Sequence, residues 1–171
     1  MKLTRREFSE LAAEATLGAG ALSLFGQSSP ARAAAPEQDT GPVFIKAGEL
    51  QWAKMFPDWG DISPEIAILR VDPKTQATHL MIRNSKAMHV PRHWHSANET
   101  HTVLAGSMVF ECDGKRETLG PGGFNYIPKK MVQQAWLPDS GWVLITVDAA
   151  WDVHWVDGPP GPEVIGKSST E

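Results

Sequence analysis

The chain has 171 residues, a length that suits one domain of ordinary size. Its 16 Lys and Arg residues against 20 Asp and Glu residues give a formal net charge of −4 at pH 7. With no basic run in the sequence, this balance argues against a nucleic-acid partner. Its single cysteine, Cys112, excludes an intrachain disulfide.

Residues 1–33 have the order of a secretory signal. The pair Arg5 and Arg6 precedes an apolar run rich in Ala, Gly and Leu, and a small-residue cleavage site lies near residues 33–35. This order is similar to a bacterial Tat signal. A membrane anchor is the alternative, but the run is short and carries Glu14, so we expect no stable membrane association after cleavage. The expected location is periplasmic or secreted.

The rest of the chain is predicted to be all-β and to form one domain. We expect a flexible linker over 34–42, a β-barrel over 43–157 and a flexible tail over 158–171. Short runs of strand-forming residues alternate with Gly, Pro, Asn and Asp clusters, and no segment has a sustained helical period. The predicted strands are 43–46, 65–71, 78–82, 89–95, 99–104, 108–112, 117–119, 125–127, 133–137, 142–147 and 152–155. Many short strands at such spacing favour a sandwich or barrel.

A candidate metal-ligand set lies in the middle of these strands. His93 and His95 share parity, so on an extended strand both rings leave the same face. The polar residues 96–98 can turn the chain and bring Glu99 back towards the two rings. Two imidazoles and a carboxylate suit Fe, Mn, Ni, Co or Zn better than Ca or Mg. The sequence therefore predicts one divalent transition metal, whose identity it leaves open.

These residues resemble a cupin, and more narrowly a single-domain bacterial cupin of type-2 character. The residues that match the first cupin motif are His93, His95, Glu99 and Gly106, with Pro91 just before them. The second motif is degenerate and covers residues 120–128. The resemblance extends over roughly residues 43–157. It implies a cupin jelly-roll β-barrel with the ligand hairpin facing an internal cavity.

One position departs from the cupin pattern. Cupins usually supply a third imidazole five residues after the proline of the second motif, and this chain has Gln133 there. The Gln133 carbonyl could ligate the metal, or it could only bind a metal-bound water. A metal-free binding or structural protein is a third possibility. His101 shares the parity of Glu99, so it could complete the metal site or act as a general acid or base. A core histidine bonded to backbone is the alternative.

Three further residues are candidates for a substrate pocket. Phe124 and Tyr126 share parity on their predicted strand and are expected to line it. Arg83 would bind an acidic substrate, unless it is simply solvated. An aromatic, apolar cavity around a metal suits a small, partly hydrophobic organic ligand.

The cupin resemblance makes a dioxygenase-type oxidoreductase the leading activity. The expected substrate is a phenol, an enol or a diketone. Isomerase or lyase chemistry and a non-catalytic metal- or small-molecule-binding protein remain alternatives, because fold alone does not supply function. A homodimer is also left open.

Overall fold

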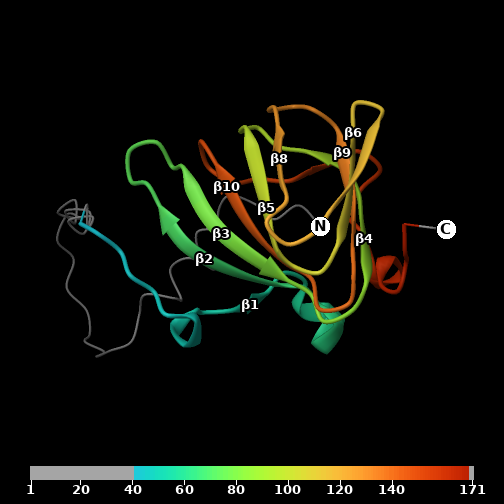
Figure 1. Cartoon of the computed structure of the whole chain (residues 1–171), viewed down its shortest axis with the longest axis horizontal. Coiled ribbons are helices and arrows are strands. Elements are labelled where there is room, and N and C mark those ends of the chain that lie inside the picture. The colour runs from blue at the N-terminus through green and yellow to red at the C-terminus, as the bar shows by residue number, and fades with distance from the viewer. Residues whose placement is uncertain (1–40, 170–171) are drawn as a thin grey trace, which may run out of the picture.

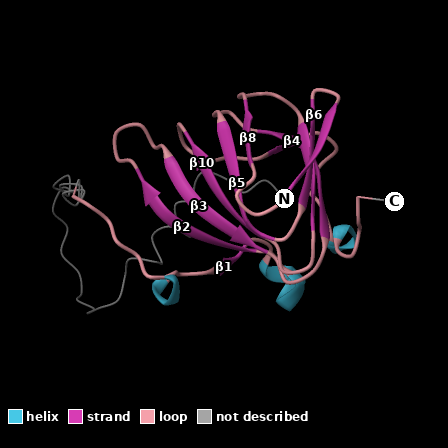
Figure 2. Cartoon of the chain, in the orientation of Figure 1, coloured by secondary structure: helices cyan, strands magenta, loops and turns pink. Residues whose placement is uncertain are grey.

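The structure is a computed structural model that describes residues 41–169. The predicted signal, residues 1–33, lies outside the described residues. The described chain folds into two antiparallel β-sheets that face each other, with short 3-10 helices at the edges (Figures 1 and 2). The helices are η1 (Ala47–Glu49), η2 (Pro57–Ile62) and η3 (Pro162–Val164). None of the helices in residues 41–169 has the length and apolar character needed to cross a membrane.

The first sheet has the strand order β1-β2-β3-β10-β5-β8, and the second has the order β11-β4-β9-β6-β7. The strands of the first sheet are β1 (Ala53–Lys54), β2 (Glu65–Val71), β3 (Thr78–Arg83), β5 (Glu99–Ala105), β8 (Phe124–Ile127) and β10 (Trp142–Val147). Those of the second are β4 (Met88–Trp94), β6 (Met108–Cys112), β7 (Lys115–Leu119), β9 (Gln133–Leu137) and β11 (His154–Trp155). This arrangement is the jelly-roll barrel that the cupin resemblance implies.

Turn chemistry explains where the strands break. The β6–β7 hairpin turns through Asp113 and Gly114, whose φ angles are 52° and 71°. Two consecutive positive φ angles are the requirement of the tight hairpin turn that an Asp-Gly pair favours. The predicted strands 65–71, 108–112, 133–137 and 142–147 agree with the structure residue for residue.

The chain differs from the prediction at its two ends. The predicted strand 43–46 is absent: Phe44 is 89% exposed, and the first strand is β1, which pairs with β2. The expected flexible tail contains a docked segment, because Val164 is buried and the Gly166 N–H donates a hydrogen bond of 2.7 Å to the Ala87 carbonyl. Residues 43–46 have strand propensity but no pairing partner, so they do not form a strand. The burial of Val164 and the hydrogen bond of Gly166 together hold the tail segment on the barrel.

The hydrophobic core lies between the two sheets. Leu80 from the first sheet and Met108 from the second are fully buried, and Val103 lies beside them. Full burial of one such side chain contributes roughly 1.5–3 kcal/mol relative to an exposed one. Because strand residues alternate between faces, the inward side chains next to this core form the wall of an internal cavity.

Candidate metal centre

The candidate ligands come from β4, β5 and the turn that joins them. His93 lies near the end of β4, His95 follows that strand, and Glu99 begins β5. All three are buried, Glu99 to 1% exposure, and they line the same internal cavity. His101 lies two residues further along β5 and faces the same way. The alternation in the sequence therefore places four candidate side chains around one point of the barrel interior.

Each of the three imidazoles is held at Nδ1 by an oxygen atom. His93 Nδ1 donates to the Pro91 carbonyl at 2.7 Å, and His95 Nδ1 donates to the carbonyl of Asp152. His101 Nδ1 lies 2.8 Å from Oδ1 of Asn125, its cross-strand neighbour on β8. A carbonyl oxygen can only accept, so Nδ1 carries the hydrogen. Nε2 of each ring is then the nitrogen directed towards the cavity, which is the usual orientation of a metal-binding histidine.

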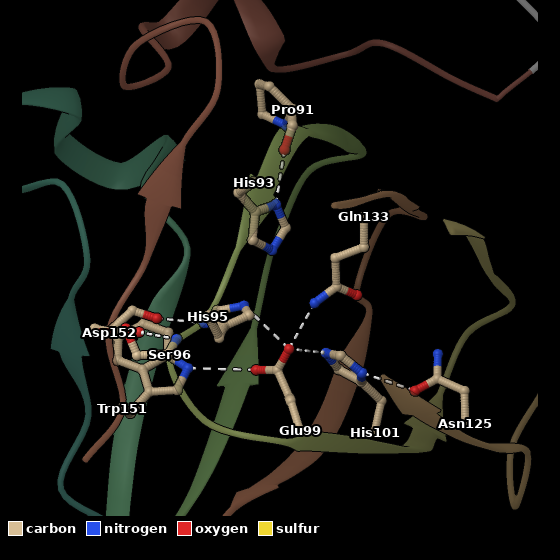
Figure 3. A network of polar contacts seen from close by, with 10 residues as sticks. All are labelled: Pro91, His93, His95, Ser96, Glu99, His101, Asn125, Gln133, Trp151 and Asp152. Atoms are coloured by element: carbon tan, nitrogen blue, oxygen red, sulfur yellow. Dashed lines mark hydrogen bonds and ion pairs between the residues drawn. The ribbon is translucent and has the colours of Figure 1, made fainter. Parts of the chain in front are cut away.

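The carboxylate of Glu99 is the hub of this cluster (Figure 3). Its Oε2 lies 3.0 Å from His95 Nε2 and 3.5 Å from His101 Nε2. Gln133 Nε2 donates to the same oxygen at 2.7 Å, and Trp151 Nε1 donates to Oε1 at 3.4 Å. The buried carboxylate therefore has polar partners on both oxygens.

Burial and charge determine how this cluster holds its protons. Burial raises the pKa of Glu99, but His101, His95 and His93 outweigh it and lower the pKa to about 2. Burial, followed by the neighbouring His95, lowers the pKa of His93 to about 4. Burial lowers the pKa of His95, but its hydrogen bond to Glu99 and the Glu99 charge reverse that effect and raise it. At neutral pH His93 is therefore neutral and Glu99 ionised.

The donor chemistry fits a divalent transition metal. Imidazole nitrogens with Nδ1 fixed and one buried carboxylate are the ligands such ions prefer. Within residues 41–169, however, no group of three or more His, Cys, Asp or Glu side chains stands in an arrangement that could hold a metal ion as it is. The fit therefore rests on the donor set and its Nδ1 anchors.

Gln133 lies in the cavity, where the sequence expects it, with 3% exposure. It stands opposite His93 in the pairing of β4 with β9. Its amide N–H groups have no lone pair for a metal, and one of them is directed at Glu99. His101 and Gln133 both contact Glu99, and of these two His101 offers the better donor atom for a metal.

The three predicted pocket residues do not reach this cavity. Phe124 and Tyr126 are 60% and 54% exposed, and β8 pairs them with Thr102 and Thr100, which point away from the barrel interior. Their strand neighbour Asn125 faces inward in their place. The prediction places Phe124 and Tyr126 on the inward face of β8, and the structure places Asn125 there. Because side chains alternate between the two faces of a strand, this one-residue difference turns both aromatic rings outwards.

Arg83 also lies outside the cavity. Its Nε donates to Glu65 at 2.7 Å, and its guanidinium stacks 4.1 Å from the ring centroid of Trp52. Arg83, which the sequence analysis proposes as the group that binds an acidic substrate, is therefore engaged in an exposed ion pair and a cation–π contact.

The cavity itself is small and mostly apolar. Its volume is about 90 Å³. The side chains that line it besides the polar cluster are Met55, Phe56, Pro64, Ile82, Met88, Val90, Pro91, Phe110, Ala135, Leu137, Val143, Ile145, Trp151, Trp155 and Pro160. None of the described residues around it is a Lys or an Arg.

Three residues that contact the cluster, Asn125, Trp151 and Asp152, are not predicted from the sequence. Only Asn125 had a signal, which was its parity opposite to Phe124 and Tyr126.

Comparison with known proteins identifies a cupin match in the middle of the chain. The family model of the cupin domain matches residues 79–141, which include every candidate ligand. No curated protein matches the chain significantly.

Solved structures of low identity share the fold. The structure of KdgF from a Halomonas species is 20% identical, with 64% of this chain and 94% of that chain covered and a TM-score of 0.52. An RmlC-like cupin from Shewanella frigidimarina is 17% identical, with 64% and 93% covered and a TM-score of 0.53. The Cnp3 cupin domain of Schizosaccharomyces pombe is 8% identical, with 63% and 74% covered and a TM-score of 0.52. Residues 79–141 thus match the cupin domain, and the chain folds as a cupin jelly-roll barrel.

Proposed function

We propose that this protein is a metal-dependent enzyme, of dioxygenase-type oxidoreductase activity, that acts on a small organic molecule inside the barrel. One observation carries the proposal. Three imidazoles, each fixed at Nδ1 by an oxygen, and one buried carboxylate converge in a mostly apolar cavity. A core histidine with a purely structural role does not need two similar neighbours around an ionised carboxylate.

The residues that would hold the metal are His93, His95 and Glu99, with His101 as the fourth. A bound Fe, Mn, Ni, Co or Zn ion would supply Lewis-acid chemistry and, for a redox-active ion, a place for dioxygen. Gln133 keeps the carboxylate of Glu99 in place through its N–H group. The apolar wall excludes water and so strengthens every charge interaction at the site.

The cavity also restricts the substrate. A volume of about 90 Å³ is smaller than the roughly 150 Å³ of an engineered apolar cavity that accepts benzene. A short enol or diketone therefore suits the site better than a phenol. With Arg83 engaged at the surface and no Lys or Arg among the described lining residues, an uncharged substrate is favoured.

The test is dioxygen uptake by the metal-reconstituted protein with short diketones, enols and phenols. We expect uptake with an enol or diketone, and a loss of at least ~100-fold in the His101→Ala variant. The matched control is His79→Ala, which removes an exposed imidazole on β3. Product formation without dioxygen uptake would favour an isomerase or lyase instead. Saturable binding without turnover would favour the non-catalytic alternative.

Export is the second part of the proposal. It rests on Arg5 and Arg6 ahead of the apolar run, which lie outside the described residues. The double substitution Arg5→Lys/Arg6→Lys is expected to leave uncleaved precursor in the cytoplasm, as read by fractionation and mass. Normal export of this variant would refute a Tat signal.

A further inference from the structure

The loop between β10 and β11, residues 148–153, is fastened to the turn that joins the candidate ligands. Asp148 Oδ1 accepts the Asn98 N–H at 3.0 Å, and its Oδ2 accepts the Asn98 side-chain amide at 2.5 Å. Asp152 Oδ1 accepts the Ser96 N–H at 2.8 Å. Ala97, between these two anchor points, is buried. The turn between His95 and Glu99 is therefore held at both ends by carboxylates of one loop.

The same loop contacts two of the candidate ligands directly. The Asp152 carbonyl accepts the Nδ1–H of His95, and the Trp151 indole N–H is directed at Glu99 Oε1 at 3.4 Å (Figure 3). Trp151 is 8% exposed, and its ring centroid lies 6.2 Å from that of His95. Two consecutive residues thus fix one imidazole and one carboxylate from positions more than 50 residues away in the sequence.

The side chain of Asp152 is itself held on both sides of His95. Its Oδ2 pairs with His154 Nε2 at 3.1 Å, and the His154 ring stacks on Trp94 at 3.9 Å with an interplanar angle of 7°. Together with the Ser96 contact, these interactions attach Asp152 to both residues that flank His95. The Asp152 carboxylate is part exposed, so it can be changed without opening a cavity in the core.

We infer that Trp151 and Asp152 are positioning residues that orient Glu99 and His95 for metal binding. The inference rests on the proposed function for its metal, but the orientation of the two side chains can be measured without one. Asp152 acts on the tautomer and direction of the His95 ring, and Trp151 acts on Oε1 of Glu99, to which its indole N–H is directed. Partners of this kind typically change metal affinity by ~10–100-fold.

The experiment compares Asp152→Ala, Asp152→Asn and Trp151→Phe with the wild-type protein. In metal-free protein, NMR of the imidazole nitrogens reports the His95 tautomer, and hydrogen exchange reports the Ser96 amide. Titration with Co²⁺ then gives affinity and the visible spectrum of the bound ion. In Asp152→Ala we expect mixed His95 tautomers, faster Ser96 exchange and an affinity ~10-fold lower or more. Asp152→Asn should restore most of this, because its Oδ1 still accepts from Ser96.

Trp151→Phe removes the indole N–H and keeps an aromatic ring in the cavity wall. We expect a Co²⁺ affinity at least ~3-fold lower and a changed Co²⁺ spectrum, with the His95 tautomer preserved. The matched control is Trp142→Phe, because the buried Trp142 Nε1 has no hydrogen-bond partner among the described residues. Asp157→Ala is the control for Asp152, since Asp157 lies just after β11 and pairs with Arg92 at the surface.

Each outcome decides a separate claim. Unchanged His95 tautomer and Ser96 exchange in Asp152→Ala would overturn the role of Asp152. A wild-type Co²⁺ spectrum and affinity in Trp151→Phe would overturn the role of Trp151. Equal losses in the two control variants would reduce both effects to general destabilisation and overturn the inference. If the wild-type protein binds no Co²⁺ while Asp152→Ala still releases the His95 ring, the proposed function fails and the positioning by Asp152 stands.

Discussion

Gln133 Nε2 donates a hydrogen bond of 2.7 Å to Glu99 Oε2, and both side chains are buried. A glutamine therefore stands where the cupin pattern has an imidazole, and its N–H group donates a hydrogen bond to the carboxylate of Glu99. Because Glu99 is ionised in the folded protein, with its pKa lowered to about 2, a neutral donor beside it is favourable and a second carboxylate is not.

Gln133→Glu should therefore destabilise the protein at neutral pH. It replaces a donor with a second carboxyl group next to a buried charge, and we expect the free energy of unfolding to fall by ~2–4 kcal/mol. The matched control is Gln134→Glu, whose neighbour Glu111 is partly exposed on the outer face of the sheet and already paired with Arg116. Solvent screening should keep that loss below ~1 kcal/mol. Urea unfolding at pH 7 compares the two, and equal losses would contradict the account.

Much of this site could be predicted from the local sequence. Parity along two strands predicts that His93 and His95, and Glu99 and His101, share faces, and turn residues predict where those strands end. Such features depend on neighbours a few residues apart.

The parts that failed depend on distant pairing. Whether Phe124 or Asn125 faces the cavity is set by the register of β8 against β5, which the degenerate second motif does not reveal. The contacts of Asp152 with His95 and of Trp151 with Glu99 join residues 57 and 52 positions apart. No local pattern encodes contacts of that range.

His101 should matter more for metal affinity than Gln133. His101 presents an imidazole Nε2 towards Glu99, whereas Gln133 presents an amide N–H. Imidazole is the better donor towards late first-row ions, so His101→Ala should lower Co²⁺ or Zn²⁺ affinity more than Gln133→Ala, by ~10-fold or more. Competition titration with a chelator of known affinity measures both. If Gln133→Ala lowers the affinity more than His101→Ala, the amide group of Gln133 must rotate and ligate the metal through its oxygen. Retained affinity with lost turnover would instead make His101 an acid or base.

Acid should destabilise the metal-free protein through His93. Its folded pKa is about 4, below the ordinary value of 6.5, so between these values the unfolded chain takes up a proton that the folded protein does not. The stabilisation is fully present above pH 6.5 and is lost as the pH falls towards 4, at up to ~1.4 kcal/mol per pH unit. Glu99, with a folded pKa of about 2 against 4.5, adds a loss in the same direction below pH 4.5.

Substitution isolates the His93 contribution. In His93→Gln the free energy of unfolding should vary less between pH 6.5 and pH 4 than in the wild-type protein. Urea unfolding with a chelator present, at several pH values in that window, gives both slopes. Parallel slopes would show that His93 titrates alike in the folded and unfolded chains.

Gly106 is required by both its backbone and its surroundings. Its φ is +80°, and a Cβ built on it would lie 2.5 Å from Pro138 Cγ. Gly106→Ala should cost ~1–2 kcal/mol for the left-handed conformation and ~1–3 kcal/mol more for the collision. Gly114, with φ +71° and no atom within 4 Å of such a Cβ, is the control and should show only the first cost. Thermal unfolding of the two alanine variants distinguishes them, and identical losses would remove the steric part of the explanation.

We propose that His93, His95 and Glu99 hold a metal ion, and the metal content of the native protein decides whether they do. The measurement is elemental analysis of the protein purified in its native state without a metal-affinity column, beside the His93→Ala/His95→Ala variant prepared in the same way. We expect about one equivalent of a divalent transition metal per chain in the wild-type protein and essentially none in the variant. Full metal content in the double variant, or a wild-type protein that neither contains such a metal nor takes one up on titration, would contradict it.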